Sequence, residues 1–125
     1  MINSLHIEGT RKTPLISFDI TGKFRIEGRS IPEDANLFFG KVIEWLEEYT
    51  SSSRDETTID VALEYLNSGT SKFILLILKQ LTEFSLDNHT LIVNWFYEEG
   101  DDDILERGEY YASILDIDIN YIETE

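Results

Sequence analysis

The stretch TTIDVALEYLNSGTSKFILLILKQLTEF, residues 57–84, decides the fold. Its first part alternates apolar and polar side chains, which predicts a β-strand over Thr57–Leu66. Its last part, Lys72–Phe84, holds eight large apolar side chains and little polar face, which predicts a largely buried helix. Asn67–Ser71 lies between them as a predicted turn that carries three hydroxyl groups.

A second apolar run follows this helix and predicts another strand, Thr90–Tyr97. A strand, a helix and a strand in succession predict a right-handed parallel crossover within one sheet. After it, the acidic segment Glu98–Asp103 leads into a predicted helix over Ile104–Ile114. The alternation in Asp116–Ile122 predicts a final strand at the edge of the sheet.

Short strands are predicted upstream of this unit. Leu5 and Ile7 mark one of them, and Leu15–Ile20 marks the next. A Thr-Gly-Lys turn then leads into Lys23–Glu27, which alternates and predicts the return strand of a β-hairpin. The Phe and Ile side chains of that return strand are expected on its inner face.

A helix start is predicted between this hairpin and the central strand. Ser30 and Glu33 have the spacing of a capping box, and Pro32 is suited to a first helical turn. Apolar residues then recur with helical spacing as far as Tyr49. The polar segment Ser51–Asp55 is expected to end this helix.

The order of these elements predicts an α/β fold, with a single mixed β-sheet and helices packed on it. At 125 residues we expect one domain over residues 1–125, with a core large enough to be stable without disulfides or structural metal ions. The chain has no cysteine, which excludes disulfides, thiolate nucleophiles and zinc–thiolate sites.

Charge narrows the classes of partner. The formal net charge of −15 opposes binding to nucleic acid and to anionic membranes, because neither contact would release counterions. The negative charge either keeps the protein soluble or attracts a basic partner surface, and the composition leaves both interpretations open. The start of the chain lacks the pattern of a signal peptide, and the longest apolar run, Phe73–Leu78, is too short to span a bilayer. We therefore expect a cytoplasmic protein without membrane insertion.

The hydroxyl-rich turn Asn67–Ser71 is the first candidate site. Ser68 or Thr70 is expected to cap the following helix. Capping does not exclude phosphorylation, because a phosphate carries about −1.5 to −2 charges and is tolerated at the positive end of a helix. Its effect would then fall on a partner that covers this surface.

Other candidate sites have simpler explanations. The acidic segment Glu98–Asp103 lacks the spaced ligands of an EF-hand, and acidic residues that lead into a helix explain it better than a metal. His6 and His89 lie outside any metal-binding spacing and are expected to be surface or strand-edge residues. Asn94 is expected to face solvent or a neighbouring strand. Neither a P-loop nor a nucleophile elbow is present, so we predict no catalytic residue, metal or cofactor.

With these segments in place, the chain resembles the SiaC-like family of regulatory phosphoproteins over nearly its whole length. The matching segments are Glu8-Gly9-Thr10, Thr13-Pro14, Gly28–Asp34 (GRSIPED), Phe39, Trp45, Leu63–Ser68 (LEYLNS) and Val93–Tyr97 (VNWFY). That family is similar to anti-sigma-factor-antagonist (STAS-type) domains, so the resemblance implies a STAS-like fold and partner switching.

The resemblance also implies partners and a modified residue. A serine/threonine kinase would phosphorylate the turn, a PP2C-like phosphatase would reverse this, and the unmodified form would bind and activate an effector, a diguanylate cyclase in this family. The family's acceptor follows the asparagine, which places it at Ser68, with Thr70 as second choice. Serine replaces the family's frequent threonine here and is chemically adequate.

The resemblance places the partner-binding surface on the same turn. Its expected residues are Asn67, Gly69, Thr70, Ser71 and Lys72. Two alternatives stay open: a constitutive scaffold of the same fold, and a small metal-dependent enzyme that uses the acidic segment.

Overall fold

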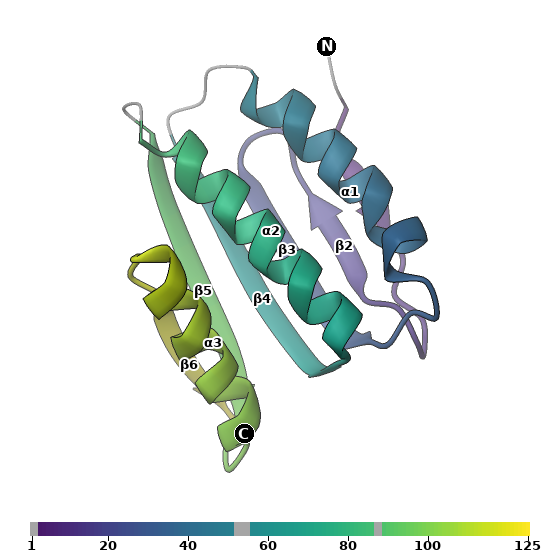
Figure 1. The fold of residues 1–125 in the computed structure, drawn as a ribbon, viewed down its shortest axis with the longest axis vertical. Helices are drawn as coiled ribbons and strands as arrows, with labels where there is room; N and C mark the ends of the chain where they lie inside the picture. Colours follow the sequence, from purple (N-terminus) through teal and green to yellow (C-terminus); the bar gives the residue numbers. More distant parts are fainter. Residues whose placement is uncertain (1–2, 52–55, 87–88) are drawn as a thin grey trace.

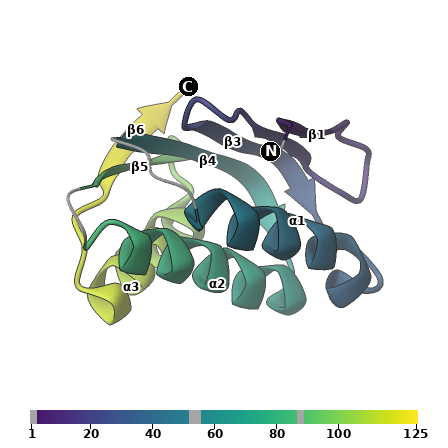
Figure 2. The same ribbon diagram turned by 90° about the horizontal axis from the view of Figure 1, so that it is seen from above.

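A computed structural model describes residues 3–51, 56–86 and 89–125. It contains one six-stranded sheet with three helices on one of its faces (Figures 1 and 2). The strands are β1 (Leu5–Ile7), β2 (Leu15–Phe18), β3 (Lys23–Ser30), β4 (Glu56–Leu66), β5 (Thr90–Glu98) and β6 (Asn120–Thr124). The helices are α1 (Ala35–Thr50), α2 (Ser68–Phe84) and α3 (Asp102–Leu115). The predicted α/β fold with a mixed sheet is confirmed.

The strands lie in the sheet in the order of the sequence. The β1–β2 and β2–β3 pairs are antiparallel, whereas β3–β4, β4–β5 and β5–β6 are parallel. Each parallel pair is joined through a helix, so β4, α2 and β5 form the predicted parallel crossover. Successive crossovers that advance in one direction with the same hand place their helices on the same face. Figure 2 shows this single helical layer, with the other face of the sheet uncovered.

The core lies between the helical layer and the sheet. The Trp95 side chain is fully buried, and its Nε1 donates a hydrogen bond to the Ile104 carbonyl oxygen over 2.8 Å. A Cβ on Gly108 would lie 2.7 Å from Trp95 Cδ1, so α3 approaches β5 as closely as only a glycine allows. Phe24 and Ile26 are buried, as predicted for the inner face of the hairpin.

The predicted start of the first helix is wrong. Ser30 is the last residue of β3, and the N-cap of α1 is Asp34, whose Oδ1 accepts a hydrogen bond from the Leu37 amide at 3.1 Å. The strand continues past its expected end because its parallel pairing with β4 resumes after an irregularity at Gly28, where φ is 108°. Long-range pairing therefore overrides the local capping pattern.

The second helix also starts earlier than predicted. Asn67 is its N-cap, so Ser68–Ser71 forms the first turn of α2 and not a separate loop. Its inner face is buried, but Leu75 is half-buried and Leu76 is 38% exposed, so the helix keeps an open face. The last strand starts later than predicted. Asp116 is the C-cap of α3, with a left-handed φ of 54°, and β6 begins only at Asn120.

The two histidines differ. His6 is exposed, and its Nε2 lies 2.8 Å from a Glu8 carboxylate oxygen. His89 is only 7% exposed, and its Nε2 lies 2.7 Å from the Thr57 hydroxyl, which in turn contacts the Tyr49 hydroxyl. The expectation of a surface position is therefore wrong for His89. Within the residues described, no helix is long and apolar enough to cross a membrane.

Candidate phosphorylation and partner-binding site

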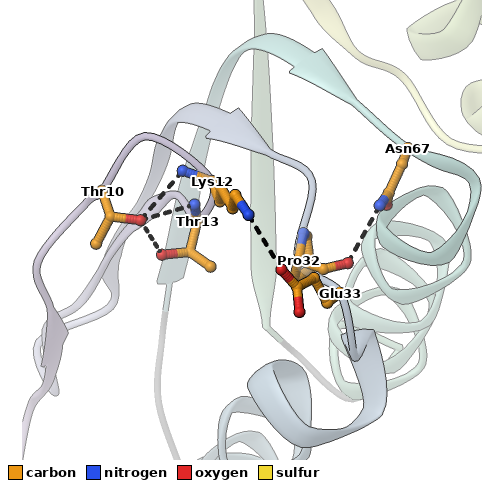
Figure 3. Close-up of polar contacts among 6 residues, drawn as sticks. All are labelled: Thr10, Lys12, Thr13, Pro32, Glu33 and Asn67. Carbon is orange, nitrogen blue, oxygen red and sulfur yellow. Dashed lines mark hydrogen bonds and ion pairs between the residues drawn. The ribbon is translucent and has the colours of Figure 1, made fainter.

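Asn67 holds the start of α2 in place. Its Oδ1 accepts a hydrogen bond from the Thr70 amide at 2.9 Å, which caps the helix. Its Nδ2 donates to the Pro32 carbonyl oxygen over 3.3 Å (Figure 3). Its backbone amide donates to the Ser30 carbonyl oxygen over 3.0 Å. Both ends of the side chain are used, so the helix start is tied to the segment between β3 and α1.

A second loop braces that segment. The Ile31 amide donates to the Lys12 carbonyl oxygen at 2.7 Å, and the Lys12 ammonium lies 3.0 Å from a Glu33 carboxylate oxygen (Figure 3). Thr10 closes this loop by accepting hydrogen bonds from the amides of Lys12 and Thr13. The start of α2 is therefore supported by two loops that come from distant parts of the chain.

Thr70 is fully buried. Its hydroxyl lies 2.7 Å from the Ser30 hydroxyl and donates to the Ser30 carbonyl oxygen at 3.1 Å. A phosphate on this atom would bring its charge into the core and break both contacts. The geometry therefore favours Ser68 over Thr70 as an acceptor.

Ser71 connects α2 to α3. Its hydroxyl lies 2.7 Å from the Tyr111 hydroxyl and accepts a hydrogen bond from Arg107 Nη1 at 2.7 Å. The Tyr111 hydroxyl also donates to the Ser71 carbonyl oxygen at 2.8 Å. Burial raises the pKa of Tyr111, opposed by its contacts with Ser71 and Arg107, so this phenol stays protonated and keeps its role as donor.

Ser68 is the exposed hydroxyl of this turn. It is the first residue of α2, and within the residues described its side chain makes no hydrogen bond. Lys72 lies one turn further along the same face and is also exposed. On the other side, a Cβ on Gly69 would lie 3.0 Å from the Ala35 Cβ, so Gly69 allows α1 to pack closely. A phosphate on Ser68 would meet free backbone amides and a lysine without entering the core.

The acidic segment serves as the start of α3. Asp101 Oδ1 accepts a hydrogen bond from the Ile104 amide at 3.1 Å, and Asp102 and Asp103 lie in the first turn. No three histidine or acidic residues in the described part of the chain come together as a metal site. The simpler interpretation of this segment, acidic residues at a helix start, agrees with the geometry.

Polar side chains form a row across the uncovered face of the sheet, and Asn94 contacts neighbouring strands in it as expected, whereas the sequence analysis missed the other three. Asn94 donates to Asp60 at 2.8 Å and accepts from Asn120 at 3.0 Å, and Arg25 donates to Asp60 at 3.1 Å. These four residues are neighbours in register on β3, β4, β5 and β6. Each of the four strands contributes one polar residue to this row, but each holds other polar residues too, and only the register shows which ones meet.

Sequence reasoning also missed Ser30, Arg107 and Tyr111 as parts of the α2 start. Ser30 had been interpreted as a helix cap, and the other two lie on a helix that carried no candidate residue. Their roles depend on contacts with residues 36 to 40 positions away in the chain.

Comparisons with known proteins assign the chain to a family. The family model described as SiaC family regulatory phosphoprotein matches residues 7–124. An uncharacterised protein of Pseudomonas aeruginosa strain UCBPP-PA14 is 31% identical over 111 residues, which cover 88% of each chain.

Solved structures of SiaC from Pseudomonas aeruginosa are also similar. One, of SiaC as the activator in complex with the diguanylate cyclase SiaD, has a TM-score of 0.89 at 28% identity and covers 96% of this chain and 99% of that one. The apo-SiaC structure has a TM-score of 0.85 at 28% identity over 99% of this chain and 100% of that one. The chain belongs to the SiaC family of regulatory phosphoproteins.

Proposed function

We propose that this chain is a phosphorylation-controlled binding protein whose unmodified form binds and activates a diguanylate cyclase. Phosphorylation of Ser68 by a serine/threonine kinase would release the cyclase, and a PP2C-like phosphatase would restore binding. The chain itself would act in the cytoplasm without catalysis, metal or cofactor. The observation that carries the proposal is the hydroxyl of Ser68, which is exposed at the capped start of α2 and makes no hydrogen bond to any residue that the structure describes.

Two findings support this assignment. SiaC of Pseudomonas aeruginosa, whose structure is similar over almost the whole chain, is the activator in a complex with a diguanylate cyclase. The contacts of the other hydroxyls in the turn also support Ser68, because Thr70 is buried against Ser30 and Ser71 is held by α3.

The exposure of each residue refines the proposed partner-binding surface. Lys72 is exposed, and Asn67, Gly69 and Ser71 are partly exposed, so these four can contact a partner together with Ser68. Thr70 is buried, so we assign it the role of supporting the surface from below. A phosphate would thus change the binding surface and leave the core intact.

The test compares cyclase binding by wild-type protein, Ser68→Ala and Ser68→Asp in titration calorimetry. We expect Ser68→Ala to bind like the wild type and Ser68→Asp to bind at least about tenfold more weakly, because a charge enters the interface. Ser113→Asp is the matched control, since Ser113 is an exposed serine on α3. Equal binding by the Ser68 variants would refute the switch at this residue.

A further inference from the structure

The exposed face of α2 carries a row of side chains that no other element covers. Ser68, Lys72, Leu76 and Lys79 follow one another at intervals of four, four and three residues, so they share one face of the helix. All four are exposed. We call these four residues the α2 stripe.

The neighbouring helices frame this stripe and leave it open. On one side, Phe73 of α2 stacks on Phe39 of α1 with ring centroids 5.2 Å apart. On the other side, Ser71 bonds to Tyr111 of α3. Figure 2 shows α2 between α1 and α3 in one layer, so its outer face points away from the sheet.

The charge of the stripe differs from that of the rest of the helical layer. The charged residues of α2 are Lys72, Lys79 and Glu83. On α1, a single lysine stands among three glutamates. On α3, a single arginine stands among four acidic residues, two of which are aspartates in the first turn. In the described part of the chain neither stripe lysine forms an ion pair. The stripe is therefore a basic strip on a molecule of net charge −15.

We propose that the α2 stripe docks an acidic amphipathic helix of the effector, an inference that rests on the proposed function. An apolar side chain of that helix would pack on Leu76, which is 38% exposed, and carboxylates beside it would pair with Lys72 and Lys79. The charges are complementary: the acidic residues on α1 and α3 repel such a helix, so within the helical layer the stripe is where it can bind.

This assignment explains how a phosphate on Ser68 would act. Lys72 lies one helical turn from Ser68, close enough to pair with a phosphate there. The phosphate would neutralise Lys72 and add about −1.5 to −2 charges at one end of the stripe. An acidic partner would then lose its attraction to Lys72 and be repelled by the phosphate. These two effects together weaken binding more than the bulk of the phosphate alone.

The experiment uses a synthetic helical peptide with leucines along one face and glutamates beside them, and a twin peptide with lysines in place of the glutamates. Each is titrated into isotopically labelled full-length protein, and amide chemical shifts are followed by NMR. We expect the acidic peptide to shift the amides of α2 around the stripe, with affinity that falls between about 0.05 M and 0.5 M salt. The basic twin should leave these amides unchanged.

Variants make the test specific. The double variant Lys72→Glu/Lys79→Glu should weaken binding of the acidic peptide by about tenfold or more, because two attractions become repulsions. Lys41→Glu is the matched control, since Lys41 is an exposed lysine on α1, and it should leave the affinity unchanged. If the acidic peptide leaves α2 unshifted, or the basic twin shifts it equally, the proposal is overturned.

The same titration separates this inference from the proposed function. If the acidic peptide binds the stripe but the cyclase binds the Ser68-phosphorylated protein as tightly as the unmodified one, the stripe stands and the phosphorylation switch fails. If phosphate on Ser68 still releases the cyclase while the acidic peptide ignores the stripe, the switch stands and the acidic partner is wrong.

Discussion

The starts of α2 and α3 lie at the same edge of the sheet but are built differently. Both helices follow parallel strands, β4 and β5, and both are capped by a side chain, Asn67 for α2 and Asp101 for α3. The first turn of α3 contains two aspartates, whereas that of α2 contains no acidic residue. Figure 1 shows both helices starting near the lower end of the molecule.

This difference bears on regulation. Free backbone amides give each helix start a positive potential, and a nearby anion stabilises it. In α3 the anion is permanent, because Asp102 and Asp103 are part of the sequence. In α2 its place is taken by the Ser68 hydroxyl, so a phosphate could supply the charge conditionally. We infer that the start of α2 is suited to a reversible anion.

The largest expected effect separates two hydroxyls within the first turn of α2. Thr70→Asp would place a carboxylate at a fully buried position against Ser30, and we expect it to lower the free energy of unfolding by about 3 kcal/mol or more. Ser68→Asp, two residues away and exposed, should change it by less than about 1 kcal/mol. Denaturation with urea measures both values.

The neutral variants Thr70→Val and Ser68→Ala are the controls for this pair, because they remove the hydroxyl without adding charge. Thr70→Val should fall between the wild type and Thr70→Asp. A stability of Thr70→Asp close to that of Ser68→Asp would show that the Thr70 side chain is accessible, and it would reopen Thr70 as an acceptor.

A smaller effect compares the two caps. Asp101→Ala removes one capping hydrogen bond, and we expect a loss of about 1 kcal/mol in the free energy of unfolding. Asn67→Ala removes the cap and also the bond to the Pro32 carbonyl oxygen, so its loss should be about 2 kcal/mol. Asn67→Asp is the control, since it keeps the capping oxygen and loses the donor to Pro32, while its added charge favours the helix start. Equal losses for the two alanine variants would mean that the Pro32 contact adds nothing.

Much of the fold could be predicted because its signals are local. The alternation of β4 and the apolar run of α2 lie within a few residues, and each depends on a simple periodicity. Ser30 shows where this fails: its spacing from Glu33 has the form of a helix cap, but pairing with β4 keeps the backbone extended. The residues next to Ser30 in the sequence do not show that strand pairing competes with helix capping there.

The candidate site shows the same limit. A cap at the start of α2 was expected from the residue types, but Asn67 provides it and not a hydroxyl. Ser68 and Thr70 are both hydroxyl residues of one turn, and only the contact between Thr70 and Ser30, 40 positions away in the chain, separates them. His89 is a similar case, because its buried contact with Thr57 joins positions 32 residues apart.

The smallest expected effect tests the comparison between the helix starts directly. Phosphorylation of Ser68 should raise the free energy of unfolding by about 0.3–1 kcal/mol at low salt, because the phosphate interacts with free amides and with Lys72. This gain in stability should shrink as salt is added, since Ser68 and Lys72 are both exposed. Phosphoserine incorporated at position 113, in the last turns of α3, should destabilise instead, because an anion there meets the negative end of the helix. Urea denaturation of the two phosphoproteins at low and high salt measures the contrast. If phosphate at both positions shifts stability alike, the helix start of α2 has no special affinity for an anion, and its freedom from acidic residues carries no regulatory meaning.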